Sequence, residues 1–245
     1  MKNFRMTIQY DGSRYSGWQK QGNTQNTIQG KIEDVLEKLT NEEIEIHGSG
    51  RTDAGVHALG QVANFKCNAS LSETELMDVL NSYLPLDIRI INLKEAEPRF
   101  HARLNAKKKQ YRYTINTNTV HDVFNRKYQY HLPEALNLEA MQEAIFYLQG
   151  EHDFKSFCDN KRMKKSTVRT IYEIKLTLEN GILTIDYFGN GFLYHMVRIL
   201  TGTLIEVGQG KRDPEEIPDI IRAKDRSASG FLAPAEGLTL IKVEY

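Results

Sequence analysis

The chain has 245 residues, 40% of them hydrophobic, and its 32 Lys and Arg residues balance 32 Asp and Glu residues. This length can bury one large core or two modest ones, so folding requires neither a metal nor a disulfide. We find no apolar run as long as a signal peptide or a membrane span, and Cys67 and Cys158 lie far apart. We therefore expect a cytoplasmic protein in a reducing compartment that does not enter a membrane.

The first 104 residues predict a ferredoxin-like set of elements. Alternating polarity predicts strands, helical spacing of apolar residues predicts helices, and Ser72 with Glu75 has the spacing of a capping box. The order strand, helix, strand, strand, helix, strand is the ferredoxin-like order. The predicted elements are a strand at 4–10, a helix from Thr27, strands at 43–48 and 61–66, a helix after Ser72 and a strand at 88–96.

Residues 105–245 predict a second round of the same order, although we find no matching residues between the two halves. Asn180 and Gly181 fit a two-residue hairpin turn. The sequence thus predicts an α+β protein with two ferredoxin-like domains, residues 1–104 and 105–245. The predicted elements of the second domain are a strand at 109–116, a helix at 138–148, a hairpin at 170–189, a helix from about Phe192, a short helix after Asp213 and a strand at 237–245.

Basic residues gather in two runs even though the net charge is zero. Residues 98–121 contain six Lys or Arg and no Asp or Glu, with aromatic residues among them, and residues 161–169 contain five more. Acidic residues crowd the first helix and its exit, which predicts a basic and an acidic side. Basic residues interleaved with aromatics suit a nucleic acid with splayed bases, whereas either run alone could equally be a solvated surface. Two runs favour a nucleic-acid partner.

A glycine-rich stretch, residues 47–65, surrounds Asp53. It contains neither the dinucleotide fingerprint nor a Walker A motif. Ser49, Asp53 and His57 are the residue types of a hydrolase triad, but the serine lacks a G-x-S-x-G turn, and the histidines have no metal-ligand spacing. Two alternatives remain for Asp53: it caps a turn, or it lines a cleft together with Arg51, which would point to the same side of an extended segment.

A buried Asp53 would need a nearby cation to stay ionised, because burial alone favours the neutral acid. Arg198 is a candidate, since the helix "GFLYHMVRILTG" is apolar almost all round and an arginine within it should be paired. The alternative is that Arg198 lies on the remaining exposed face of that helix.

Nine segments, in order along the chain, closely resemble the characteristic segments of the TruA-type tRNA pseudouridine synthase family. "GRTDAGVHA" is similar to the family's signature around its catalytic aspartate. The other segments are "YDGSRYSGWQKQ", "TIQGKIEDVL", "NSYLPLDI", "FHARLNAKKKQYRY", "GEHDFKSF", "TVRTI", "FLYHMVR" and "GLTLIKVEY". Each is weak alone, but nine in register are very specific. The net charge of zero is less positive than expected for an enzyme that binds RNA.

The resemblance implies an isomerase without cofactor or metal, which converts uridine to pseudouridine in the anticodon stem-loop of tRNA, typically at nucleotides 38, 39 and 40. It implies two ferredoxin-like, RRM-like halves with joined antiparallel sheets, helices on one face and the active-site cleft between the halves. It also implies a homodimer in which one tRNA touches both subunits. These properties are carried over from the family and are expectations for this chain.

The resemblance also assigns roles to residues. Asp53 would be the catalytic carboxylate, Arg198 the arginine that pairs with it, and Tyr111 the pocket tyrosine that stacks on the uracil and assists removal of the C5 proton. Arg51 would occupy the space of the flipped base, and Leu238 would form an apolar wall. The basic residues predicted to bind the substrate are Arg103, Lys108, Lys109, Arg112 and Arg169.

Three other functions stay open from the sequence. A non-catalytic RNA-binding module with RRM-like halves would need an RNP1 strand, which residues 109–116 do not supply. A glycosidase built on Asp53 would need a second carboxylate, for which Asp11 is the nearest loop residue. A family paralogue could act on ribosomal RNA. Whether Asp53 acts as a nucleophile or as a base is also open.

Overall fold

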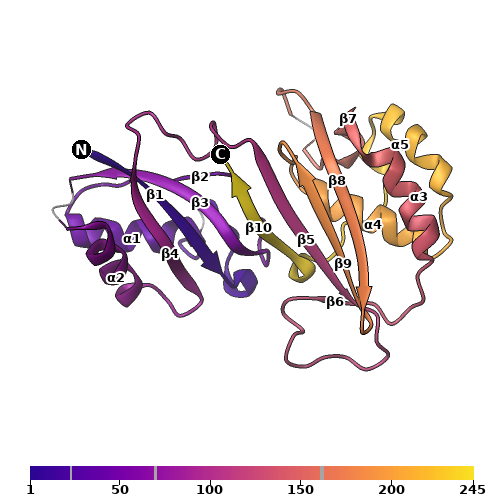
Figure 1. The fold of residues 1–245 in the computed structure, drawn as a ribbon, viewed down its shortest axis with the longest axis horizontal. Coiled ribbons are helices and arrows are strands. Elements are labelled where there is room, and N and C mark those ends of the chain that lie inside the picture. The colour runs from indigo at the N-terminus through magenta and orange to yellow at the C-terminus, as the bar shows by residue number, and fades with distance from the viewer. Residues whose placement is uncertain (23, 69–70, 161–162) are drawn as a thin grey trace. The chain divides into compact units, whose positions relative to one another are not determined.

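The computed structural model describes residues 1–22, 24–68, 71–160 and 163–245. These residues form two compact units (Figure 1): unit 1 comprises residues 1–107 and 239–245, and unit 2 comprises residues 108–238. Each unit combines a sheet with helices, so the protein belongs to the mixed α+β class. Within the described residues, every helix is too short or too polar to reach across a bilayer.

The strands of unit 1 have the order β4-β1-β3-β10, and a short strand, β2, also pairs with β3. β1 is antiparallel to both β3 and β4, as is β2 to β3. One face of β1 is buried through every second residue, which is the alternation that predicted the strand. The strands are β1 (Lys2–Tyr10), β2 (His47–Gly48), β3 (His57–Cys67), β4 (Ile88–Ala96) and β10 (Leu238–Glu244).

Two helices of unit 1, α1 (Ile28–Thr40) and α2 (Glu73–Tyr83), begin at the residues that the sequence indicated. Thr27 caps α1 by accepting from the Gly30 N–H at 3.1 Å. Ser72 and Glu75 form the predicted capping box at the start of α2. In Figure 1 the two helices lie next to each other along the sheet of unit 1. A short 3-10 helix, η1 (Gly12–Arg14), follows β1.

The last strand is where the structure departs from the predicted pairing. The strand at 237–245 was expected in the second domain and in an antiparallel sheet, but β10 pairs with β3 of unit 1, Thr239 opposite His57, and the pairing is parallel. The sheet of unit 1 is therefore mixed. Alternating polarity predicts that a segment is a strand but carries no information on a partner far away in the sequence.

The sheet of unit 2 has the order β5-β9-β8-β7 with antiparallel pairs, and β6 pairs with β5 in parallel. Asn180 and Gly181 have φ angles of 51° and 76° at the predicted hairpin turn, which a turn that matches the strand twist requires. The strands are β5 (Lys108–Asn116), β6 (Tyr130–His131), β7 (Gly150–Asp153), β8 (Val168–Glu179) and β9 (Ile182–Gly189).

The helices of unit 2 lie on one side of its strands in Figure 1. The helix predicted from about Phe192 begins later, at Met196, because His195 has a left-handed φ of 62°, which a preceding helical turn cannot contain. The helices are α3 (Leu138–Leu148), α4 (Met196–Gly208) and α5 (Ile217–Ala223), and the 3-10 helices are η2 (Phe154–Phe157), η3 (Pro214–Glu216), η4 (Arg226–Ala228) and η5 (Ala235–Gly237).

Candidate active site

Asp53 lies half-buried in a loop of unit 1 that connects β2 to β3, called here the Asp53 loop (residues 49–56). Two backbone hydrogen bonds fix its course. The Val56 N–H donates to the Asp53 carbonyl at 3.2 Å, and the Trp18 N–H donates to the Thr52 carbonyl at 3.0 Å. Trp18 is itself 2% exposed, so the loop rests on the core of unit 1.

Buried polar side chains hold the start and middle of the Asp53 loop. The Gln61 amide donates from Nε2 to the Gly50 carbonyl at 3.0 Å and accepts from the Ser49 hydroxyl at 2.7 Å. The Tyr10 and Thr52 hydroxyls share a hydrogen bond of 2.8 Å. Burial raises the pKa of Tyr10, so its hydroxyl keeps its proton. These bonds are made away from water, where an unmade bond is costly, and they fix the backbone on both sides of Asp53.

Two glycines allow the segment after β1 to pack directly on the Asp53 loop. A Cβ on Gly12 would lie 2.0 Å from the Val56 carbonyl oxygen, and Gly17 has a φ of +95° with the Thr52 oxygen 2.7 Å from the Cβ position. The Gly12 N–H also donates to His57 Nδ1 at 3.0 Å. The segment "YDGSRYSGWQKQ", one of the nine that resemble the family, thus supports the Asp53 loop. Its glycines permit this close packing, which only the fold reveals.

Ser49 and His57, two of the triad residue types that the sequence argued against as a hydrolase site, have partners in the local structure. The Ser49 hydroxyl donates to Gln61, and His57 Nδ1 accepts from a backbone N–H. Asp11, the candidate second carboxylate of a glycosidase, caps η1 by accepting from the Ser13 N–H, and its Oδ1 lies 3.3 Å from His57 Nδ1. Ser49, His57 and Asp11 therefore each contribute to the local structure.

Tyr111 lies on β5 in unit 2, opposite Tyr187 of β9, and is 7% exposed. The Phe192 ring meets it edge-on, with the ring centroids 5.3 Å apart. Tyr113, two residues along the same strand, is fully buried and donates from its hydroxyl to the Pro234 carbonyl at 2.8 Å. Tyr111 therefore belongs to a group of aromatic side chains in unit 2. The alternation of residues along β5 predicted the strand but not these aromatic contacts.

Arg198 lies in the first turn of α4, whose remaining residues are almost all buried, as the sequence predicted. Its side chain is half-buried, and its Nε donates to the Ala233 carbonyl at 2.7 Å. In turn the Ala233 N–H donates to the Arg198 carbonyl at 3.2 Å. Arg198 is thus oriented by a segment that sequence reasoning did not connect with it. Leu238, 5% exposed, follows this segment at the start of β10.

Arg51 is exposed and its Nε donates to the Gln19 side chain at 2.9 Å. The structure thus places Asp53 and Arg51 in unit 1, and Tyr111, Arg198 and Leu238 in unit 2. The pairing of Asp53 with Arg198 stays a prediction.

The predicted RNA-binding residues have different environments. Arg112 forms a bidentate ion pair with Asp186, a nearly buried acid on β9 that sequence reasoning missed, at 2.9 Å between Nη2 and Oδ2. Lys108 lies over the Phe188 ring, with Nζ 5.0 Å from the centroid. Arg169 donates to the Ser166 and Val168 carbonyls, and Arg103 is exposed. Lys109 lies opposite Gly189, and Lys161 and Arg162 lie outside the described residues.

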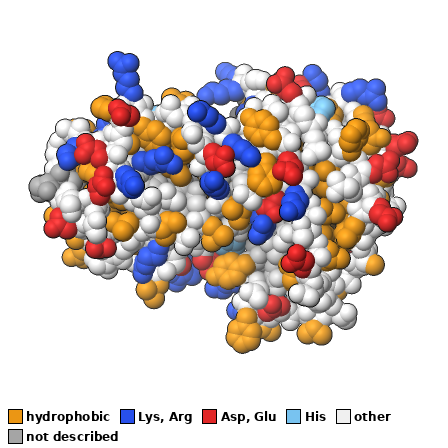
Figure 2. Space-filling model, viewed as in Figure 1, with side chains coloured by type: hydrophobic (Ala, Val, Ile, Leu, Met, Phe, Trp, Pro, Cys, Tyr) orange, Lys and Arg blue, Asp and Glu red, His pale blue; other side chains and the backbone are white. Residues whose placement is uncertain are grey.

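On the face of the molecule shown in Figure 2, Lys and Arg side chains lie interspersed with Asp and Glu side chains. The Arg112–Asp186 pair is one case in which a predicted basic contact has its charge offset by a neighbour. Among the described residues, no group of three or more His, Cys, Asp or Glu could hold a metal ion.

Comparison with known proteins identifies the class. Residues 6–105 and 144–245 match the model of a family described as tRNA pseudouridine synthase. The chain is 50% identical over its full length, and the full length of the relative, to "tRNA pseudouridine synthase A 2" of Bacillus cereus (strain ZK / E33L). The corresponding identities are 48% to "tRNA pseudouridine synthase A" of Bacillus sp. (strain KSM-64) and 47% to "tRNA pseudouridine synthase A 1" of Clostridium tetani (strain Massachusetts / E88), again over both full lengths. The chain therefore belongs to the tRNA pseudouridine synthase family and is an isomerase of uridine in tRNA, as its motifs implied.

A solved structure of a Cbf5-Nop10-Gar1 complex is similar with a TM-score of 0.40 and 12% identity. The match covers 97% of this chain, which spans about half the length of that one (48%).

Proposed function

We propose that this isomerase acts on uridines of the anticodon stem-loop, typically nucleotides 38, 39 and 40, and that Asp53 is the reacting carboxylate. The observation that carries the proposal is the construction of the Asp53 loop. Buried hydrogen bonds from Tyr10 and Gln61 and the close approach of Gly12 fix the backbone, while the Asp53 side chain itself stays half-exposed. A rigidly held, accessible carboxylate suits a reaction that depends on the position of one group.

The reaction needs no net addition or loss of atoms. The bond between C1′ of the ribose and N1 of uracil breaks, the uracil turns, and C5 bonds to C1′. The proton on C5 then leaves and N1 gains one, so the product is an isomer. The Asp53 carboxylate either bonds to C1′ for the time that the base is detached or removes a proton from the ribose as the base departs.

Arg198 and Tyr111 would complete the site. The hydrogen bond from Arg198 Nε to the Ala233 carbonyl fixes the plane of the guanidinium, so the remaining donors of the fork have a defined direction toward an anionic partner. Pairing with this cation would orient the Asp53 carboxylate and offset its charge. Tyr111 presents an aromatic face of the kind that stacks on a flipped base, with Phe192 against its ring and Leu238 as an apolar wall.

RNA binding would come from the basic residues of the chain and from a second subunit. The family's arrangement of two ferredoxin-like, RRM-like halves with joined sheets and a central cleft would place Lys108, Lys109, Arg103 and Arg169 along the RNA backbone. Extrusion of a stacked base costs a few kcal/mol, which phosphate contacts can offset. Arg112 would contribute less charge, since Asp186 pairs with it. We extend the proposal to a cytoplasmic homodimer in which one tRNA touches both subunits.

Replacement of the proposed reacting group tests its role. Asp53→Asn removes the negative charge and keeps the shape, so the variant is expected to bind tRNA but to form no pseudouridine. Asp11→Asn is the matched control, because Asp11 is a loop acid of the same unit that caps η1. Measurable turnover by Asp53→Asn would rule out a catalytic role for this carboxylate.

The pairing of Asp53 with Arg198 predicts that Arg198→Met loses activity while circular dichroism shows a folded protein. A wild-type rate in Arg198→Met would remove this arginine from the site. Mapping of pseudouridines in tRNA from cells with and without the gene tests the target. Unchanged nucleotides 38, 39 and 40 would contradict the proposed position, and a loss in ribosomal RNA instead would identify a paralogue with another substrate.

A further inference from the structure

Arg198 is oriented by a segment called here the strap (residues 229–234), which runs along α4 between η4 and η5. At one end, the Ala233 carbonyl accepts from Arg198 Nε at 2.7 Å, and the next carbonyl, that of Pro234, accepts from the Tyr113 hydroxyl at 2.8 Å. Ala233 is completely buried. The strap therefore supplies an acceptor that orients the Arg198 guanidinium at Nε.

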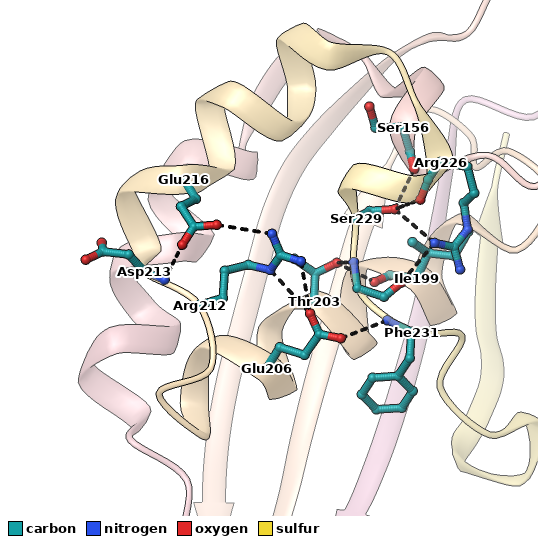
Figure 3. Close-up of polar contacts among 11 residues, drawn as sticks. Ser156, Ile199, Thr203, Glu206, Arg212, Asp213, Glu216, Arg226, Ser229 and Phe231 are labelled. Atoms are coloured by element: carbon teal, nitrogen blue, oxygen red, sulfur yellow. Dashed lines mark hydrogen bonds and ion pairs between the residues drawn. The ribbon is translucent and has the colours of Figure 1, made fainter.

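The other end of the strap is fixed by two side chains of α4 (Figure 3). The Gly230 N–H donates to the Thr203 hydroxyl oxygen at 2.9 Å, and the Phe231 N–H donates to Oε1 of Glu206 at 3.1 Å. The Thr203 hydroxyl uses its own hydrogen on the Ile199 carbonyl at 2.9 Å, so its oxygen is left to accept. The N–H groups of two consecutive strap residues thus donate to side-chain acceptors on α4, and these two bonds set the register of the strap along the helix.

Glu206 is in turn held by Arg212. Nε and Nη2 of Arg212 contact Oε2 of Glu206 at 3.3 and 3.1 Å, which leaves Oε1 directed at the strap (Figure 3). The two side chains are 22% and 18% exposed, so the pair is largely shielded from water. The third nitrogen of the guanidinium reaches Glu216, which closes the capping box of η3 through the Asp213 N–H.

We propose that the Glu206–Arg212 pair is a positioning device for Arg198: Glu206, oriented by Arg212, holds the strap at Phe231, and the strap carries the Ala233 carbonyl that orients the Arg198 guanidinium. The inference rests on the proposed role of Arg198. It assigns to Glu206 and Arg212 a function in catalysis although neither is placed at the reacting atoms.

A charged acceptor is suited to this task. The hydrogen bond from a backbone N–H to a carboxylate is stronger than one to a neutral acceptor, and Arg212 prevents the carboxylate from turning toward water. A single residue, Leu232, separates Phe231 from Ala233, so a displacement of the backbone at Phe231 also moves the Ala233 carbonyl. The first turn of α4, which carries Arg198, keeps its own helical hydrogen bonds.

The test compares Glu206→Ala with Glu216→Ala in the full-length enzyme. Both variants remove an acid that contacts Arg212, but only Glu206 touches the strap. Exchange of the Arg198 Nε–H proton with solvent is followed by nitrogen-15 NMR, with the signal assigned through Arg198→Lys. Steady-state kcat and KM are measured with transcribed tRNA, well below the unfolding temperature.

We expect Glu206→Ala to accelerate exchange at Arg198 Nε by about tenfold or more and to lower kcat by a similar factor, with KM within about twofold. Glu216→Ala should leave both within about twofold, and Glu206→Gln, which retains an acceptor for the Phe231 N–H, should keep most of the protection. A purely structural role would instead lower stability in both alanine variants without a selective effect on Arg198.

Unchanged exchange at Arg198 in Glu206→Ala would overturn the inference. Faster exchange with an unchanged kcat would overturn it as well, because orientation of Arg198 would then have no consequence for the reaction. The proposed function is tested separately by Asp53→Asn and Arg198→Met, so its failure and the failure of this inference give different results.

Discussion

Gly202 lies on the side of α4 that faces the strap. Replacing it with alanine tests whether α4 fixes the position of the strap. A Cβ on Gly202 would lie 1.9 Å from the Phe231 carbonyl oxygen and 2.8 Å from its carbonyl carbon. Because Cβ atoms do not approach other atoms more closely than about 3.0 Å, the strap must move away from α4 by about 1 Å. The obstacle is backbone, so no side-chain rotation can relieve the contact.

The size of the effect follows from three contributions. Alanine is favoured over glycine within a helix by about 1 kcal/mol. Overpacking against a fixed backbone costs about 1 to 3 kcal/mol. Displacing the strap also weakens the hydrogen bonds from Gly230 to Thr203 and from Phe231 to Glu206, each of about 1 kcal/mol. Gly202→Ala should therefore lower the free energy of unfolding by about 2 to 4 kcal/mol, although helix propensity alone predicts a gain.

Denaturant unfolding measures this stability, and Gly208→Ala is the control. Gly208 is in the same helix, but its Cβ would meet the flexible side chains of Met141 and Leu136, so the free energy should stay within about 1 kcal/mol of wild type. Gly202→Ala is also expected to lower kcat, because the displaced strap carries the Ala233 carbonyl away from Arg198. A Gly202→Ala variant as stable and as active as wild type would show that α4 does not fix the strap.

Three further predictions concern the RNA path, the Asp53 loop and alkaline stability. Charge reversal of Lys108 and Lys109 to Glu should weaken tRNA binding and flatten its salt dependence. The slope of the logarithm of the binding constant against the logarithm of the salt concentration should fall in magnitude by about 0.7 to 0.9 for each phosphate that the variant no longer neutralises. An unchanged slope would show that the RNA does not contact these two residues. Gly12→Ala would put a Cβ 2.0 Å from the Val56 carbonyl oxygen and so displace the Asp53 loop. Since a displacement of 1 Å can cost about a hundredfold in rate, kcat should fall by about that factor. A wild-type kcat would show that the close approach of Gly12 does not fix the position of Asp53. Burial raises the pKa of Tyr187 above its ordinary 10.0, so this tyrosine loses its proton in the unfolded chain at a lower pH than in the folded protein. The contribution of Tyr187 to the free energy of unfolding is therefore constant at neutral pH and should fall above about pH 10, by up to 1.4 kcal/mol per pH unit. Tyr187→Phe should reduce that slope, and identical slopes would refute the assignment.

Two kinds of residue contribute to the proposed function. Asp53, Tyr111 and Arg198 are the residues with a proposed chemical role, while Tyr10, Gln61 and Glu206 hold backbone segments next to them. The second kind is buried or half-buried, so each hydrogen bond is made in surroundings where an unmade bond is expensive. Variants of these supporting residues are therefore expected to alter the rate without altering the chemical groups that react.

The sequence by itself determined most of the local structure and the family. Alternation of apolar residues predicted β1 and β4, the Ser72 capping box fixed the start of α2, and the Asn180–Gly181 turn fixed the β8–β9 hairpin. All of these features depend on residues within a few positions of one another. The motif around Asp53 predicted the family, which the comparisons confirm.

Only the tertiary structure decided which distant segments meet. β10 has the pattern of any half-buried strand, and its parallel pairing with β3 depends on a partner about 180 positions earlier in the chain, since Thr239 lies opposite His57. Likewise, the sequence around Asp186 does not indicate that this acid pairs with Arg112, and nothing near Ala233 indicates that its carbonyl orients Arg198. Such contacts are set by the packing of whole elements, which local spacing does not encode.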